Sequence, residues 1–266
     1  MNITFLGTGS NTPTPKKEGK PFRSYSSILV DIGKETLLFD IGPGTLTKLQ
    51  QSGISTGSVP TTLFLTHYHV DHCLDYVGII KERALRFLQG ENISKLTVYG
   101  PLGLLKWHEQ LWMNESWSYM VKELHVSQLV DLHEIDESNI VQQNNWKVDS
   151  LSVPHENGLA YKLDTQGKSF VYSGDMGYIQ TFADFSQNAD MVTIECSFPD
   201  KKSVKGTHLC PEDVGRLAKA GNWRQAVLTH LYPCCEGKEH MMIDTVITIA
   251  KTVKVIVAYD LLKLLV

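Results

Sequence analysis

The strongest constraint on this chain is a cluster of histidines that follows directly after a short apolar run. Residues 62–66 are apolar or β-branched throughout, which is typical of a buried strand. The next six residues, 67–72, read HYHVDH and contain three imidazoles and one carboxylate. So dense a group of metal-binding side chains at the end of a buried strand predicts a metal site built on a β-sheet.

The spacing within the cluster favours two metal ions over one. If the chain stays extended after the strand, alternation places His67, His69 and Asp71 on one side, and a turn into the next helix brings His72 beside them. Imidazole and carboxylate groups suit zinc, manganese or iron. Four ligands this close together do not fit one tetrahedral ion, so a pair of metals is the more natural arrangement.

Three further candidate ligands each stand at the end of a predicted strand. They are His155 after residues 147–153, Asp175 after 169–172 and His230 after 225–228. A single histidine in such a place is more often structural, but together the three put ligands at one edge of a sheet sandwich, where loops build sites. Four other histidines lie in helical or irregular contexts and are not counted as candidate ligands: His108, His125, His133 and His240.

Strands and helices follow one another along the chain without a linker, a low-complexity tract or a shift in composition. One α/β domain over residues 1–266 is therefore expected, with a partly helical insert at 75–145 that could supply a lid or a dimer surface. The expected strands are 2–6, 27–31, 36–40, 62–66, 95–99, 147–153, 159–163, 169–172, 191–195, 225–228 and 253–258. The expected helices are 45–52, 75–89, 102–113, 211–220 and 240–251.

Composition and charge narrow the choice of partners and compartment. With 25 Lys+Arg against 29 Asp+Glu the net charge is −4, which disfavours RNA as a partner without excluding it. No apolar run approaches the roughly 20 residues that span a bilayer, and the first residues carry neither the basic region nor the cleavage site of a secretory signal. Five cysteines, an odd number without repeating spacing, favour a reduced cytoplasmic protein.

Several short motifs, taken with the histidine cluster, resemble the metallo-β-lactamase superfamily, and within it the ribonuclease Z-like branch. The resemblance runs through nearly the whole chain. Beyond the cluster it is carried by GTGS at 7–10, FDIGPGT at 39–45, VPH at 153–155, SGD at 173–175, ECS at 195–197, THL at 207–209, LTH at 228–230 and AYD at 258–260. It implies a four-layer αββα sandwich of two mixed β-sheets with helices outside.

The resemblance also implies how the ligands divide between two divalent ions, with zinc expected and manganese or iron as alternatives. One ion is held by His67, His69 and His155, the other by Asp71, His72 and His230, and Asp175 bridges them. Asp71 is also expected to be a catalytic residue. Asp40 is expected to orient one of the histidine ligands, a support that fixes the tautomer and basicity of an imidazole.

Two further residues distinguish the branch from the rest of the superfamily. In the branch, the counterpart of His208 faces the scissile phosphate and a glutamate hydrogen-bonds it. We therefore expect His208 to act as general acid or transition-state stabiliser, with Glu195 holding its imidazolium. The alternative is that His208 merely precedes the helix that begins at Pro211.

The resemblance implies a dinuclear metal-dependent hydrolase, in the first place a phosphodiesterase. Members that process transfer RNA carry a long Gly/Pro-rich arm between the positions matching His155 and Asp175, whereas here only the 19 residues 156–174 lie between them. Together with the net charge, this favours a smaller substrate, such as a cyclic or simple phosphodiester. Two alternatives stay open: a carboxylic ester, lactone or thioester hydrolase on the same scaffold, and a non-catalytic binding or structural protein. Dimerisation is common in the branch, so a homodimer is a further expectation.

Overall fold

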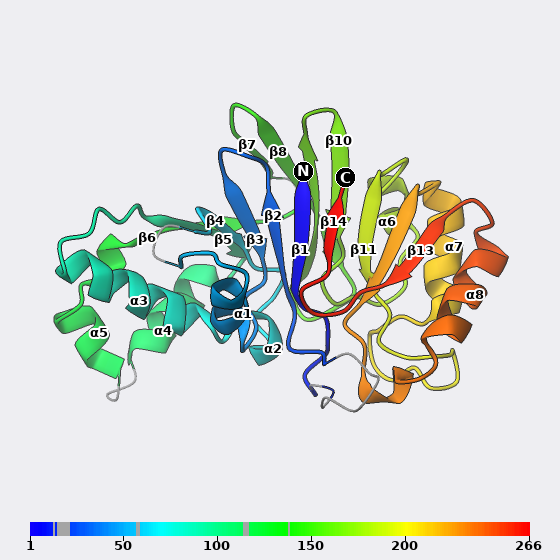
Figure 1. Ribbon diagram of the computed structural model, residues 1–266, viewed down its shortest axis with the longest axis horizontal. Helices are drawn as coiled ribbons and strands as arrows, with labels where there is room; N and C mark the ends of the chain where they lie inside the picture. The colour runs from blue at the N-terminus through cyan, green and yellow to red at the C-terminus, as the bar shows by residue number, and fades with distance from the viewer. Residues whose placement is uncertain (13, 15–21, 57–58, 114–116, 138) are drawn as a thin grey trace.

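The computed structural model describes residues 1–12, 14, 22–56, 59–113, 117–137 and 139–266, and within them two β-sheets pack face to face. Each sheet has seven strands among these residues, and helices cover both outer faces, as Figure 1 shows. The predicted four-layer αββα sandwich is confirmed. None of the described helices combines the length and the apolar character that crossing a membrane requires.

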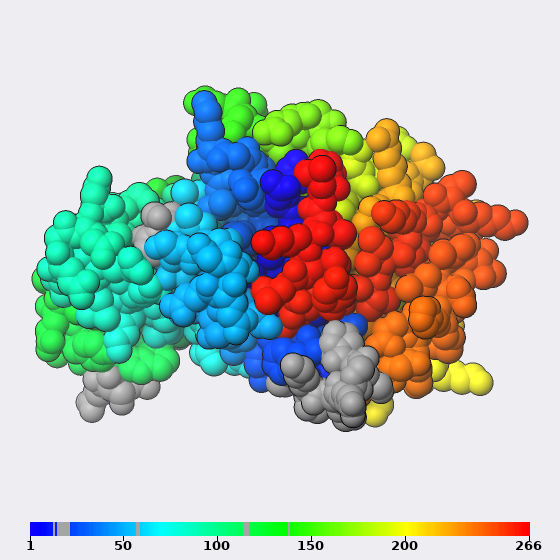
Figure 2. Space-filling view, in the orientation of Figure 1, coloured from blue at the N-terminus to red at the C-terminus, as the bar shows by residue number. Residues whose placement is uncertain are grey.

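The first sheet is built mainly from the N-terminal half of the chain. From one edge to the other its strands are β14 (Lys263–Leu265), β1 (Asn2–Gly7), β2 (Ser27–Asp31), β3 (Thr36–Phe39), β4 (Thr62–Phe64), β5 (Leu96–Pro101) and β6 (Val130–Ile135). Strands β3 to β6 run parallel, and the pairs from β14 to β3 are antiparallel. Because β14 pairs with β1, the two ends of the chain lie side by side on one face (Figure 2). The outer face carries α1 (Thr45–Gln51), α3 (Tyr76–Leu88), α4 (Leu104–Met113) and α5 (Ser118–Lys122).

The second sheet is built in the same way from the C-terminal half. Its strands, again from edge to edge, are β13 (Lys254–Val257), β12 (Gln225–Thr229), β11 (Met191–Glu195), β10 (Lys168–Tyr172), β9 (Gly158–Thr165), β8 (Trp146–Val153) and β7 (Ile140–Gln142). Strands β10 to β13 are parallel and β7 to β10 antiparallel, so this sheet is mixed as well. Its outer face carries α6 (Thr181–Phe185), α7 (Pro211–Gly221) and α8 (Glu239–Ile249).

Alternation along the central strands explains why they read as unbroken apolar runs. Phe39 and Phe64 point into the layer between the sheets, where their rings stack with centroids 5.2 Å apart. Phe170 of the second sheet meets Phe39 edge-on at 5.8 Å in the same layer. Leu38 and Leu63 point the other way, into the helix-covered layer. Because both faces of these strands are buried, both must be apolar.

Most predicted elements are present, with ends that differ from the prediction by one or two residues. The sequence pattern does not predict the strands β6, β7 and β14 or the short helices α5 and α6. Residues 75–145 contain β5, β6 and β7 as well as α3 to α5, so this segment contributes strands to both sheets. Its role as a lid or dimer surface stays a prediction. All five cysteines are free thiols, as expected.

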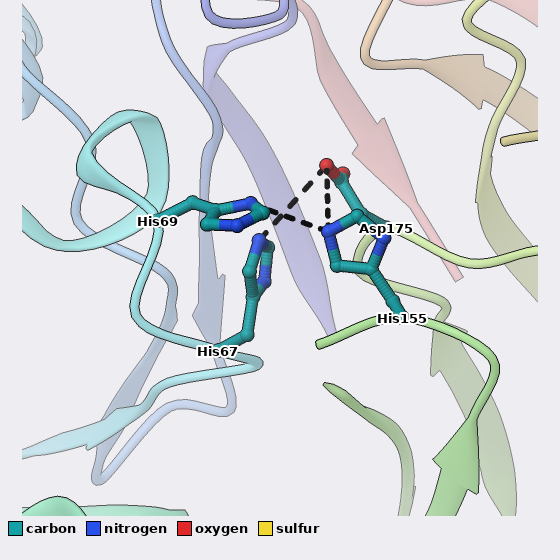
Figure 3. Close-up of side chains that lie close together, drawn as sticks. All are labelled: His67, His69, His155 and Asp175. Atoms are coloured by element: carbon teal, nitrogen blue, oxygen red, sulfur yellow. Dashed lines mark hydrogen bonds and ion pairs between the residues drawn. The ribbon is translucent and has the colours of Figure 1, made fainter. Parts of the chain in front are cut away.

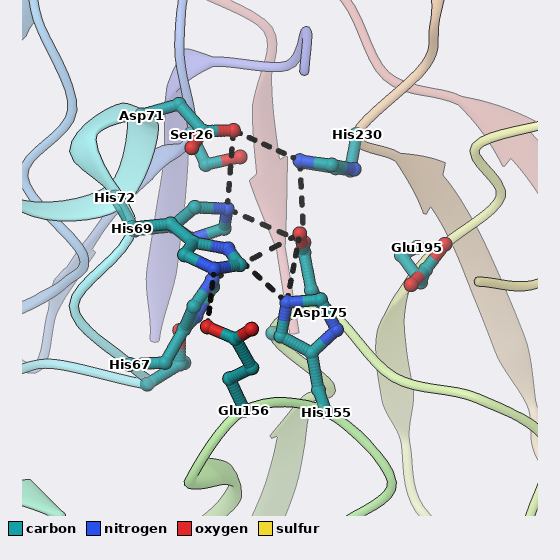
Figure 4. A network of polar contacts seen from close by, with 12 residues as sticks. Ser26, His67, His69, Asp71, His72, His155, Glu156, Asp175, Glu195 and His230 are labelled. Carbon is teal, nitrogen blue, oxygen red and sulfur yellow. Dashed lines mark hydrogen bonds and ion pairs between the residues drawn. The ribbon is translucent and has the colours of Figure 1, made fainter. Parts of the chain in front are cut away.

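The structure differs in one local respect from the sequence analysis, in which an extended chain as far as Asp71 and a turn before His72 bring the ligands together. A short helix, α2 (Val70–Cys73), begins directly after His69, so Asp71 and His72 lie in a helical turn and not on the face of a strand. The carbonyl of His72 accepts a hydrogen bond of 2.7 Å from the backbone N–H of Ile41. This bond ties the turn to the segment after β3 and turns Asp71 and His72 toward the second sheet (Figure 4).

Candidate metal centre

The predicted metal ligands come together at one edge of the sandwich, where the carboxyl ends of strands from both sheets meet (Figure 4). His67 and His69 follow β4 of the first sheet, and Asp71 and His72 lie in α2. The second sheet supplies the remaining three, which each follow a strand: His155 after β8, Asp175 after β10 and His230 after β12. Parallel strands that end at one edge therefore bring together residues far apart in the sequence.

The first cluster contains His67, His69, His155 and Asp175, whose ligand-type atoms all lie within 4.8 Å of one another (Figure 3). Nδ1 of His69 lies 3.2 Å from Nε2 of His155. Oδ2 of Asp175 lies 3.9 Å from Nε2 of His155 and 4.0 Å from Nε2 of His67. Ligand atoms spaced in this way leave room for a central ion with bonds of about 2 Å.

The second cluster contains Asp71, His72, Asp175 and His230, and its ligand-type atoms meet the same limit of 4.8 Å. Oδ1 of Asp175 lies 3.2 Å from Nε2 of His230 and 3.3 Å from Nε2 of His72. Oδ2 of Asp71 lies 3.3 Å from Nε2 of His230. Asp175 thus presents one carboxylate oxygen to each cluster, which is the arrangement expected of a bridging ligand.

Unpaired buried atoms in the two clusters fit a pair of divalent cations. Nε2 of His67, Nε2 of His72 and Oδ1 of Asp175 are buried. Although the last two lie 3.3 Å apart, none of the three makes a well-formed hydrogen bond in the described part of the chain. Leaving such a group unpaired costs about 1–3 kcal/mol, so native structures normally satisfy it. Imidazole nitrogen and carboxylate oxygen are ligands for zinc, manganese and iron alike, and cations among them would satisfy all three atoms.

Local charge and burial hold two of the candidate ligands, Asp175 and His67, in the forms that bind metal ions. Burial alone would raise the pKa of the Asp175 carboxyl, but His230 and His72 outweigh burial and hold that pKa well below its usual range. Burial, reinforced by the neighbouring His72, lowers the pKa of His67 well below its ordinary value. Asp175 is therefore a carboxylate and His67 a neutral imidazole, and metal ions bind both groups in these states.

The second ring nitrogen of each histidine has a partner outside its cluster. The contacts are Thr66 Oγ1 to His67 Nδ1 (3.0 Å), Glu156 Oε2 to His69 Nε2 (3.1 Å), Asp40 Oδ2 to His72 Nδ1 (2.7 Å), Thr207 Oγ1 to His155 Nδ1 (3.1 Å) and Ser197 Oγ to His230 Nδ1 (2.9 Å). Such partners fix the tautomer and ring orientation of metal-binding histidines. The sequence predicts only Asp40 among them. The others belong to no ligand motif, although three of them stand next to a predicted site residue in the chain.

Asp40 reaches the site from the residue after β3, with a backbone φ of 59° that aspartate tolerates better than most residues. Its carboxylate accepts hydrogen bonds from Nδ1 of His72 at 2.7 Å, the backbone N–H of Thr66 at 2.8 Å and the Tyr172 hydroxyl at 2.8 Å. Burial and the charge of Asp40 raise the pKa of Tyr172 well above its ordinary value, so this phenol stays a donor. The sequence analysis misses Tyr172, which ends β10 just before the SGD motif.

His208 and Glu195 form the predicted pair at the side of the two clusters. Oε1 of the fully buried Glu195 lies 2.9 Å from Nδ1 of His208, whose side chain is 13% exposed. Burial alone would lower the pKa of His208, but the hydrogen bond and charge of Glu195 raise it above its ordinary value. The His208 ring lies 5.5 Å from that of His155 and 5.7 Å from that of His230. His208 does precede α7, as the alternative interpretation has it, yet its ring packs against histidines of both clusters.

Solved structures of other proteins share this fold. The metallo-β-lactamase fold protein YhfI from Bacillus subtilis superimposes with a TM-score of 0.80 at 21% identity, covering 99% of this chain and 98% of that one. The short form of human tRNase Z superimposes with a TM-score of 0.76, also at 21% identity, covering 100% of this chain and 99% of that one. The fold is therefore the metallo-β-lactamase fold.

Sequence comparisons extend the similarity to named relatives. The ribonuclease Z of Methanothermobacter thermautotrophicus aligns at 24% identity, with the alignment covering 87% of this chain and 86% of that protein. This similarity confirms the predicted resemblance to the ribonuclease Z-like branch. A sequence model described as anti-Pycsar protein Apyc1 matches residues 1–240 of this chain.

Proposed function

The chain belongs to the anti-Pycsar protein Apyc1 family, and we propose that it is a dinuclear metal-dependent phosphodiesterase whose substrate is smaller than transfer RNA. Its similarity to ribonuclease Z over most of both chains places it among metal-dependent hydrolases. The observation that carries the proposal is the pair of ligand clusters that share Asp175, with one carboxylate oxygen facing each cluster.

The ligands are assigned to two ions, for which zinc is the expected metal. His67, His69 and His155 hold one ion, Asp71, His72 and His230 hold the other, and Asp175 serves both. A pair of bound divalent cations supplies positive charge to the phosphoryl oxygens and eases deprotonation of an attacking water. We assign Asp71 a catalytic role as well, because its carboxylate belongs to the second cluster and lies 3.3 Å from Nε2 of His230.

Beyond the ligands, the chain contributes a proton donor. Glu195 keeps a proton on Nδ1 of His208 through their 2.9 Å contact, so Nε2 is the nitrogen that can give up a proton to the substrate. A phosphodiester held at the clusters lies beside this ring, since His208 packs against both His155 and His230. As the bond from phosphorus to the leaving oxygen breaks, His208 protonates that oxygen and its charge stabilises the transition state.

The proposed substrate class rests on the segment between His155 and Asp175. Strands β9 and β10, with their connecting turn, take up most of the interval from His155 to Asp175. This hairpin supports the proposal that the long arm of transfer-RNA-processing relatives is absent, and the net charge of −4 gives no overall attraction to a polyanion. A cyclic or simple phosphodiester is the substrate that we propose.

The experiment that tests the proposal compares four substrates with one metal-analysed preparation. Purified protein is assayed with bis(p-nitrophenyl) phosphate, a panel of cyclic mononucleotides, a precursor transfer RNA and p-nitrophenyl acetate, and its metal content is measured alongside. We expect two metal ions per chain and hydrolysis of the small phosphodiesters in preference to the RNA. Faster hydrolysis of the acetate would instead favour the ester hydrolase alternative, and preferred cleavage of the RNA would overturn the substrate assignment.

A further inference from the structure

A third group of ligand-type side chains lies beside the two clusters, and a hydroxyl fills its centre. Glu195, His208 and His230 bring such atoms within 4.8 Å of one another, which makes them the third group of this kind among the described residues. Oγ of Ser197 lies 2.6 Å from Oε2 of Glu195, 2.9 Å from Nδ1 of His230 and 3.4 Å from Nδ1 of His208. Because the hydroxyl takes the space that a cation would need, Ser197 satisfies this group in place of an ion.

The direction of the hydrogen bonds at Ser197 follows from donor and acceptor chemistry. A carboxylate oxygen of Glu195 can only accept, so the serine hydroxyl donates its single proton to Glu195. Towards His230 the same hydroxyl oxygen is an acceptor, and Nδ1 of His230 therefore carries the ring proton. The lone pair of the ring is then on Nε2, which faces Asp175 at 3.2 Å and Asp71 at 3.3 Å.

We propose that Ser197 is a positioning residue that sets the tautomer of His230 for the second cluster and orients Glu195 towards His208. The inference rests on the proposed function, because it requires His230 to bind metal through Nε2. One buried hydroxyl then links the proton-donating pair to a metal ligand. Without it, the Nδ1–H of His230 has lost its acceptor, and the ring is held less firmly in the orientation that binds metal.

Thr207 offers a matched control because it makes the same kind of contact in a different environment. Its hydroxyl lies 3.1 Å from Nδ1 of His155, but Thr207 is exposed whereas Ser197 is fully buried. Solvent can replace the Thr207 hydroxyl when it is removed. The oxygen atom missing from a Ser197→Ala variant lies where bulk solvent does not reach. The two variants therefore remove equivalent hydrogen bonds with and without replacement by water.

The test measures zinc affinity of the purified chain by titration against a competing chelator, together with NMR of the His230 ring in the zinc-loaded protein. Ser197→Ala is expected to weaken binding of one of the two zinc ions by about 10–100-fold. The same variant should shift or broaden the Nδ1–H resonance of His230. Ser197→Thr, which keeps a hydroxyl, should bind zinc far more tightly than Ser197→Ala. Thr207→Val should weaken zinc binding less than Ser197→Ala does, because solvent can replace the lost hydroxyl.

The outcomes separate this inference from the proposed function. A wild-type protein that binds fewer than two zinc ions contradicts the proposed function itself. If the wild type binds two ions and Ser197→Ala binds both as tightly, with an unchanged His230 resonance, the inference alone is wrong. Zinc binding by Ser197→Thr as weak as that of Ser197→Ala would also overturn the inference, because the hydroxyl would then not be the group that matters.

Discussion

Oδ2 of Asp40 lies 2.7 Å from Nδ1 of His72, and both side chains are fully buried. The same carboxylate accepts a hydrogen bond from the Thr66 hydroxyl at 2.9 Å, and that hydroxyl lies 3.0 Å from Nδ1 of His67. Since the threonine proton goes to Asp40, the threonine oxygen is left to accept from His67. Asp40 therefore supports one histidine of each cluster, His72 directly and His67 through Thr66.

Asp40→Ala is accordingly expected to weaken metal binding by roughly 10–100-fold, at both clusters and not only at the one it touches. Zinc titration against a competing chelator measures the two affinities. Tyr172→Phe is the matched control, because it removes a 2.8 Å hydrogen bond to the same carboxylate but leaves the carboxylate in place, so its effect should be smaller. Unchanged metal affinity and activity in Asp40→Ala would remove Asp40 from the site.

Asp175→Ala should reduce the occupancy of both metals and the activity together, because one carboxylate faces both clusters. Metal content by elemental analysis and turnover of bis(p-nitrophenyl) phosphate check this in one preparation. Glu156→Gln serves as comparison: Glu156 is an exposed carboxylate 3.1 Å from Nε2 of His69, so its loss should cost less than that of Asp175. A variant of Asp175 that keeps both metals and normal turnover would show that the ligand assignment is wrong.

The candidate metal ligands could be found in the sequence because each combines a distinctive residue type with a distinctive place. The HYHVDH cluster is dense enough to stand out, and His155, Asp175 and His230 each follow a strand. Neither Ser197 nor Tyr172 combines a distinctive residue type with such a place in the chain. Hydroxyl residues are common, and what gives Tyr172 its role is a contact with Asp40, 132 positions away in the sequence. Hydrogen-bond partners this far apart in the sequence depend on which strands lie side by side, and a local sequence pattern does not predict that.

The strands and the helix that the sequence does not predict also depend on contacts with distant parts of the chain. The edge strands β6, β7 and β14 carry exposed or half-exposed residues at most positions, so they lack the apolar run that marks a buried strand. They are strands because a neighbouring strand offers hydrogen-bonding groups. Helix α2 has only four residues, too few for a helical period to appear, and it is fixed by the bond from Ile41 to His72.

A half-buried histidine outside the two clusters makes stability depend on pH. Nε2 of His108 accepts a hydrogen bond of 3.1 Å from the Trp112 indole, and Nδ1 lies 2.7 Å from the Tyr76 hydroxyl. Burial lowers the pKa of His108 to about 4. In the unfolded chain the pKa is about 6.5, so between these values the unfolded state holds a proton that the folded state lacks. This contribution to the free energy of unfolding is complete above pH 6.5 and is lost as the pH falls towards 4.

His108→Gln is therefore expected to make the protein less sensitive to acid. Urea unfolding of the metal-free protein at pH 7 and pH 5 gives the loss of stability for wild type and variant, and the loss should be smaller in the variant. His240→Gln, at an exposed position, controls for removal of a histidine as such. An equal loss of stability in wild type and His108→Gln would contradict the prediction.

The role of His208 can be tested separately from metal binding, because the hydrogen bond of its Nδ1 goes to Glu195 and His208 is not among the proposed ligands. His208→Ala should leave the metal content intact. Its kcat for a small phosphodiester should fall by roughly 10²–10⁴-fold, the range expected when one positioned acid or charge donor is lost. Loss of metal in this variant would instead show that His208 is a ligand.

Glu195→Gln should reduce kcat in the same direction but by less, because it removes the charge that supports the imidazolium while the ring stays in place. If the two residues act as a unit, the double variant should be little worse than His208→Ala alone. Losses that multiply in the double variant would mean that Glu195 acts independently of His208. Full phosphodiesterase activity in His208→Ala would contradict the proton-donor mechanism.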